Sequence, residues 1–136
     1  KFTGAKMAGA KLFGRFDFSD FKGADLKGAQ FTSRDPRDEN TSLARAGLFS
    51  GDFDGANLEG ADFTDGRLGF ASFTNAIVRG VRFNGADLTR ADFSGADVTG
   101  ASFAGANLDE AKFTGAKGFD TVTGLEQASN TDRVIR

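Results

Sequence analysis

The chain has 136 residues, and its 17 basic and 19 acidic side chains give a formal net charge of −2. This length is typical of one domain with its own core, and the balanced charge predicts no field that would steer the chain toward nucleic acid or anionic lipid. The sequence contains no His and no Cys, which excludes Ser-His and Cys-His catalysis, imidazole and thiolate metal sites, and disulfides.

The first 31 residues carry one large apolar side chain in nearly every block of five, as at Phe2, Met7 and Leu12. A period of five fits neither the 3.6-residue period of an α-helix nor the alternation of a β-strand. It fits a coil that turns a corner after each block and keeps a small and a large apolar residue inside. The step from Leu12 to Phe16 is one residue short, which predicts a tight corner near Gly14.

The pattern breaks after Phe31, and the next clean central residue is Leu43. Between them we predict a short bulged loop at 34–40 that counts as one side of a coil, because Pro cannot donate to a ladder and Asp and Asn favour turns. The loop contains Arg34, Asp35, Pro36, Arg37, Asp38, Glu39 and Asn40. Its oxygen ligands could in principle hold a hard cation, but the interspersed arginines favour a solvated or self-paired loop. We predict no metal and no cofactor.

From residue 56 to residue 115 the period of five is strict, and large apolar residues of one kind recur at every twentieth position. This predicts a four-sided coil in which like residues stack, with Phe on two opposite walls and aliphatic residues on the other two. One aromatic column contains Phe63, Phe83 and Phe103, and the other contains Phe53, Phe73, Phe93 and Phe113.

Charged residues twenty positions apart support the same register, because side chains on adjacent coils become ladder neighbours. Seven such pairs in residues 41–117 are all opposite in sign: Arg45/Asp65, Glu59/Arg79, Asp62/Arg82, Arg67/Asp87, Arg90/Glu110, Asp92/Lys112 and Asp97/Lys117.

The blocks ADLKG, ANLEG, ADFTD, ADLTR, ADFSG, ADVTG and ANLDE resemble the A(D/N)Lxx motif of the pentapeptide-repeat family. The resemblance spans about residues 1–118 and implies an all-β fold, a right-handed quadrilateral β-helix. Counting the predicted sides, we expect about six coils.

After Lys117 the repeat ends, and we predict that residues 119–136 form a short helical or irregular cap over the open end of the last coil. Thr123 could N-cap a turn of helix through 124–128. Phe119, Val122, Leu125 and either Val134 or Ile135 would then close the core. The alternative is a dimerisation surface, since the resemblance allows family members to pair through an open coil end.

The carboxylates at the second position of each repeat project onto flat, solvated faces, whereas general acid-base catalysis needs burial or crowding that raises a pKa. We therefore predict a non-enzymatic scaffold or protein-interaction module with an unknown protein partner and no direct contact with nucleic acid. The alternative implied by the resemblance is a DNA mimic that binds a topoisomerase such as DNA gyrase. Acid and base alternate along the predicted ladders, which disfavours a phosphate-like track, although the 34–40 loop would suit this role.

Two phenylalanines stand at outward or corner positions that otherwise hold polar residues or Gly. Phe49 and Phe70 lie on the same predicted wall in adjacent coils, with Gly47 and Gly69 leaving bare space beside them. They either lie flat against a neighbouring corner or form the centre of a protein-binding surface. With these two we group four loop residues as candidate partner-binding positions: Arg34, Arg37, Asp38 and Glu39. Phe18 we expect to seat the loop.

The compartment stays open between cytoplasm and periplasm, and the resemblance is commonest in bacteria. No apolar run reaches the roughly 18 residues of a membrane span, and no signal-peptide pattern is present. Because the first residue is Lys1, we expect natural sequence upstream of it.

Overall fold

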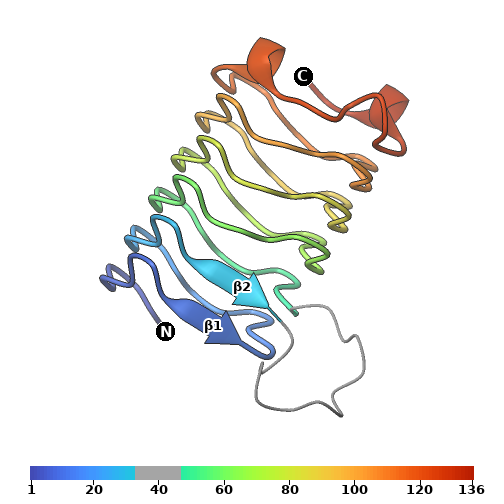
Figure 1. Cartoon of the computed structure of the whole chain (residues 1–136). Coiled ribbons are helices and arrows are strands. Elements are labelled where there is room, and N and C mark those ends of the chain that lie inside the picture. Colours follow the sequence, from blue (N-terminus) through green and yellow to red (C-terminus); the bar gives the residue numbers. More distant parts are fainter. Residues whose placement is uncertain (33–46) are drawn as a thin grey trace.

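The computed structural model describes residues 1–32 and 47–136, which form a stack of coils rising from the N-terminus to the C-terminus (Figure 1). Strand β1 (Lys11–Phe13) pairs in parallel with strand β2 (Gln30–Thr32) on the next coil. Elsewhere in the described residues the coils are joined by isolated parallel bridges, as between Asn57 and Ile77 and between Ile77 and Asp97. Between residues 47 and 117 the bridged residues are twenty positions apart, so the chain is a β-helix solenoid of stacked parallel rungs.

The Asp or Asn at the second position of each repeat helps to fold its own corner. Its side-chain oxygen accepts the backbone N–H two residues later, at 3.0 Å from Thr64 to Asp62 and 2.9 Å from Ser94 to Asp92. Short polar side chains form such local turns readily. The corner itself closes with a backbone bond over three residues, as from the N–H of Ala61 to the carbonyl of Leu58 at 2.8 Å. Each block of five therefore carries its own turn.

The core is built from the small and the large apolar residue of each block, and the described residues include no buried polar or charged residue. The predicted aromatic columns are confirmed. Rings stack face to face between coils, with centroids 5.0 Å apart for Phe53 and Phe73 and 5.4 Å apart for Phe63 and Phe83. Neighbouring columns meet edge to face, at 77° between Phe53 and Phe63. Both arrangements suit the ring quadrupole, so the two columns interlock along the axis.

The two irregular steps in the sequence have different structural outcomes. Lys11 pairs with Gln30, one residue short of twenty, and Gly14 has a φ of +105°, so the predicted tight corner is confirmed. On the following wall Arg15 is bridged to Gly47. Gln30 and Gly47 thus lie on consecutive walls, so the expectation that the loop counts as one side of a coil is wrong. Leu43 and the 34–40 loop lie outside the described residues.

The C-terminal segment contains two 3₁₀ turns, η1 (Phe119–Thr121) and η2 (Thr131–Arg133). Thr123 does not N-cap a helix as predicted. It is bridged to Ser102 and continues the ladder. The predicted turn at 124–128 does form, because the N–H groups of Gln127 and Ala128 both donate to the carbonyl of Gly124 at 3.1 Å, but it extends into no longer helix. Partly buried apolar side chains of the segment pack on the core: Phe119, Val122, Leu125, Ala128 and Val134. Ile135 stays exposed.

Three of the predicted charge pairs form ion pairs between coils: Asp62/Arg82, Arg90/Glu110 and Asp92/Lys112. Three others are not within ion-pair distance: Glu59/Arg79, Arg67/Asp87 and Asp97/Lys117. Arg79 reaches diagonally to Asp97 at 2.7 Å instead. The Arg45/Asp65 pair lies partly outside the described residues. In the portion of the chain that the structure covers, no helix has the length and apolar character of a membrane span.

Candidate partner-binding edge

The structure brings Phe49 and Phe70 together at one edge of the solenoid. Their ring centroids are 5.3 Å apart, and 42% of Phe49 and 46% of Phe70 is exposed. They belong to adjacent coils of the wall whose central residues include Leu48 and Leu68, which we call the leucine wall. The pair is therefore a half-exposed aromatic surface supported by a fully buried core.

Local sequence explains how the Phe49 ring fits against the next coil. A Cβ at Gly69 would lie 3.4 Å from the Phe49 ring, so the glycine provides room for it. The expectation for Gly47 is wrong, because its outer face is covered. A Cβ there would meet a carboxylate oxygen of Asp17 at 2.9 Å. The same oxygen accepts the backbone N–H of Phe49 at 3.0 Å, which anchors this rung to the coil below.

Asp17 is held ionised at the base of this edge. Burial would raise its pKa, but hydrogen bonds from Arg15 and from the Phe49 N–H outweigh that effect and keep the pKa below its ordinary value. The Arg15 guanidinium lies 2.7 Å from the Asp17 carboxylate. The charge pair therefore fixes the position of the Phe49 backbone rather than supplying a proton donor.

Phe18 is the residue of this edge that sequence reasoning missed. Its ring lies 5.8 Å from that of Phe49, and at 76% exposed it extends the aromatic surface by one coil. The insertion between Phe31 and Leu48 hid this neighbour, because the register across 33–46 could not be counted. Aligning the outward Phe two residues after Phe16 with the block around Leu48 would have found it.

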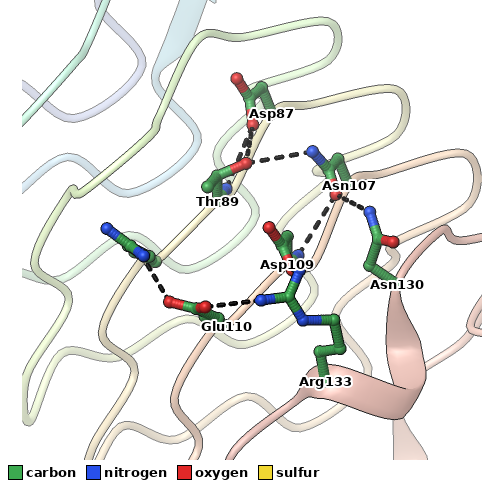
Figure 2. A network of polar contacts seen from close by, with 8 residues as sticks. Asp87, Thr89, Asn107, Asp109, Glu110, Asn130 and Arg133 are labelled. Atoms are coloured by element: carbon green, nitrogen blue, oxygen red, sulfur yellow. Dashed lines mark hydrogen bonds and ion pairs between the residues drawn. The ribbon is translucent and has the colours of Figure 1, made fainter.

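The upper half of the same edge is charged. The Arg90 guanidinium lies 5.6 Å from the centre of the Phe70 ring, in a cation–π contact, and donates to Glu110 at 2.5 Å. Arg133 of η2 reaches the other oxygen of Glu110 at 2.6 Å (Figure 2). We call the row Phe18, Phe49, Phe70, Arg90 and Glu110 the corner ridge.

Beside the corner ridge, a polar network ties the C-terminal segment to the last coils (Figure 2). Asn130 donates to Asn107 at 2.7 Å, and Asn107 donates to Thr89 at 3.0 Å. Arg133 lies 2.6 Å from a buried oxygen of Asp109. That oxygen makes no hydrogen bond of good angle, so its contact with the guanidinium is electrostatic. The network holds η2 against the solenoid.

The remaining predicted site residues are those of the loop. Arg34, Arg37, Asp38 and Glu39 lie outside the described residues.

The carboxylates of the described coils are arranged for structure. Hydrogen bonds from Thr99 and Arg79 lower the pKa of Asp97 to about 2, and a hydrogen bond from Arg90 lowers that of Glu110. A general acid needs the opposite shift. Within residues 1–32 and 47–136, no group of three or more Asp or Glu side chains is placed to hold a metal ion.

The comparisons with known proteins concern the repeat. A sequence model of pentapeptide repeats matches residues 39–65, 67–103 and 86–117, in eight copies that together span more than half of the chain. No curated protein sequence is similar to it at a significant level.

Three solved structures resemble the chain at low identity. Trypsin-treated QnrB1, a plasmid-mediated fluoroquinolone resistance protein, is 23% identical over 99% of this chain and 72% of its own, with a TM-score of 0.45. A pentapeptide repeat protein of the Arabidopsis thaliana thylakoid lumen is 28% identical over 77% and 66%, with a TM-score of 0.34. Rfr23 of the cyanobacterium Cyanothece 51142 is 20% identical over 90% and 86%, with a TM-score of 0.41.

Proposed function

Because the chain belongs to the pentapeptide-repeat family, we propose that it is a non-enzymatic protein-interaction module that binds a protein partner through the corner ridge. The observation that carries the proposal is the half-exposed contact between Phe49 and Phe70. Aromatic side chains are enriched among the residues that contribute most to protein interfaces, and a cluster of them on a polar surface marks an interaction site more often than scattered ones do.

The outer surface supports a binding role rather than a catalytic one. Its best-positioned carboxylates are engaged by arginines, as Asp62 is by Arg82 at 2.7 Å, and hydrogen bonds lower their pKa values. The same pairing argues against mimicry of DNA, which requires a row of unneutralised negative charge at phosphate-like spacing.

The proposal includes the finer architecture expected from the family resemblance. We infer a right-handed solenoid of about six coils over residues 1–118, with residues 119–136 as its cap. The packing of Phe119 and Leu125 on the core and the hold of Arg133 on Glu110 support the cap. A lid of this kind protects the last rung from pairing with other chains.

The test compares three forms of the full chain as immobilised bait in a lysate of the source organism: wild type, Phe49→Ser/Phe70→Ser, and Phe13→Ser. Phe13 is the matched control, because it is a similarly exposed Phe that lies on another wall. We expect a protein that wild type and Phe13→Ser capture and the double variant does not. That protein, purified, should bind wild type at least tenfold more tightly than the double variant. Equal affinity for all three forms would contradict the proposal.

A further inference from the structure

One corner of the solenoid lacks glycine in every described coil. At the corner after the leucine wall, the residues with positive φ are Phe18 (57°), Ser50 (52°), Phe70 (60°), Arg90 (57°) and Glu110 (54°). The equivalent positions of the next two corners are mostly glycine: Gly23, Gly55, Gly95 and Gly115 at one, and Gly28, Gly60, Gly80 and Gly100 at the other. Among the described positions, only this corner projects a row of side chains without a glycine.

The fold does not need those side chains. Left-handed backbone costs an L-residue about 1–2 kcal/mol relative to glycine, and it is uncommon for a bulky residue. Glycine closes the same turn at other corners of this chain. Phe18 and Phe70 are therefore kept at a local cost, as is common where a surface has a binding role.

The aromatic half of the corner ridge is a strip along the axis. Phe18 contacts Phe49, and Phe49 contacts Phe70, with centroids 5.8 and 5.3 Å apart. The other exposed large hydrophobic residues in the described part of the chain include Phe13 and Ile77, which lie on different walls. The strip is thus the one place where described coils present several apolar rings side by side.

The two flanks of this strip carry opposite charge. On the leucine wall, before the corner, stand Arg15 and Arg67, with Asp17 as the carboxylate between their coils. On the wall after the corner stand Asp20 and Asp52, which are bridged to each other. The second flank also carries Asp54, against Lys22, which pairs with Asp52 at 3.1 Å, and Lys1, which lies one coil below Asp20. One flank is therefore net positive and the other net negative.

We propose that the partner of the corner ridge is a second copy of this chain, related by a two-fold axis parallel to the ridge; this rests on the proposed function. Such an axis sets each aromatic ring opposite its own copy and turns the positive flank of one chain toward the negative flank of the other. An axis across the ridge would instead place like flanks together. An isologous interface requires a self-complementary surface of this kind.

The charged half of the ridge does not oppose this arrangement. Arg90 is neutralised by Glu110, and Glu110 is shared with Arg133, which also pairs with Asp109. Two copies would thus meet there through balanced networks rather than through bare arginines.

Sedimentation equilibrium of the purified full chain, from about 10 µM to about 1 mM, tests the association, because a strip of three rings predicts a weak, transient interface. We expect a reversible dimer whose Kd rises at least tenfold in Phe49→Ser/Phe70→Ser and is unchanged in Phe13→Ser. Thermal melts of all three establish that they are folded. A dimer equally stable in all three forms would place self-association elsewhere and overturn the inference.

Cross-linking tests the direction of the axis, since the native chain has no cysteine. A Glu110→Cys variant, at one end of the ridge, should form a covalent dimer with a short bis-maleimide, because a parallel two-fold places residue 110 opposite its own copy, whereas an axis across the aromatic strip would carry it to the opposite end. Ser94→Cys, on the wall of Phe93, should not. A chain that stays monomeric to about 1 mM and does not cross-link overturns the second copy as partner. The capture experiment with a different protein would still test the proposed function separately.

Discussion

Two rows of phenylalanines run along the axis of this molecule, one inside and one outside. Inside, Phe73 and Phe93 are fully buried, with centroids 4.7 Å apart and ring planes within 2°. Outside, Phe49 and Phe70 are half exposed, 5.3 Å apart and tilted by 57°. Both rows have nearly the spacing of the coils, about 4.8 Å. The spacing of the coils is enough to bring the rings of adjacent coils close together, inside or outside. Parallel stacking of the ring planes also needs core side chains packed around each ring, which only the inner row has.

The largest effect should come from breaking the inner rows. Phe83→Ala is expected to lower the free energy of unfolding by about 3–5 kcal/mol, because hydrogen-bonded coils above and below cannot collapse into the space left. Urea denaturation followed by circular dichroism measures the loss. Phe13→Ala, at an exposed site, should cost far less. Similar costs at both positions would mean that burial does not separate the two kinds of Phe.

Breaking a charge pair on the outer walls should lower the free energy of unfolding less than removing a ring from either inner aromatic column. Arg82→Asp places like charges beside Asp62 and should lower stability by up to about 1 kcal/mol. The reversed pair Arg82→Asp/Asp62→Arg should recover most of this loss in the same denaturation assay. A double variant no more stable than the single one would contradict a direct interaction between the two side chains.

Acid should lower the stability of the fold by protonating Asp97. Its pKa is lowered from 3.8 to about 2 by hydrogen bonds from Thr99 and Arg79, so the native state binds the proton less readily than the unfolded chain. Its contribution is complete above about pH 3.8 and is lost as the pH falls through about 2. Because Arg79 is more than half exposed, we expect less than about 1 kcal/mol.

Urea midpoints of wild type and Asp97→Asn, measured from about pH 5 to about pH 2, resolve this contribution. The two curves should approach each other toward the acid end, where wild-type Asp97 becomes protonated. Curves that stay parallel throughout would show that Asp97 does not contribute.

The smallest effect is expected at the outer row itself. Phe70→Gly removes a half-exposed ring and its contact with Arg90, but it relieves a φ of +60° worth about 1–2 kcal/mol. The two changes should nearly cancel, so the melting temperature should shift little. A clear loss of stability would show that the outer ring serves folding rather than binding.

How far the sequence predicted the molecule can be judged at Phe83. The period of five, the recurrence of Phe at every twentieth position and the matching charges placed it between Phe63 and Phe103, where it lies. A core made of one small and one large residue per block accepts only one register, since a slip would set rings against aliphatic columns. The pairing of Phe49 with Phe70 followed from the same count.

Other features were decided only by the tertiary structure. Phe18 found Phe49 across an insertion whose length gives no register. Arg79 forms its ion pair with Asp97 rather than with the predicted partner Glu59. A long, exposed side chain reaches a carboxylate diagonally across the ladder as easily as one directly opposite it. Thr123 joined the ladder rather than capping a helix, since the open rung of Ser102 offered backbone partners. The sequence repeat determines the arrangement of the interior, because the core side chains pack well in only one register. Chain ends, insertions and long polar side chains can each adopt several arrangements of similar energy, so only the tertiary structure shows which one forms.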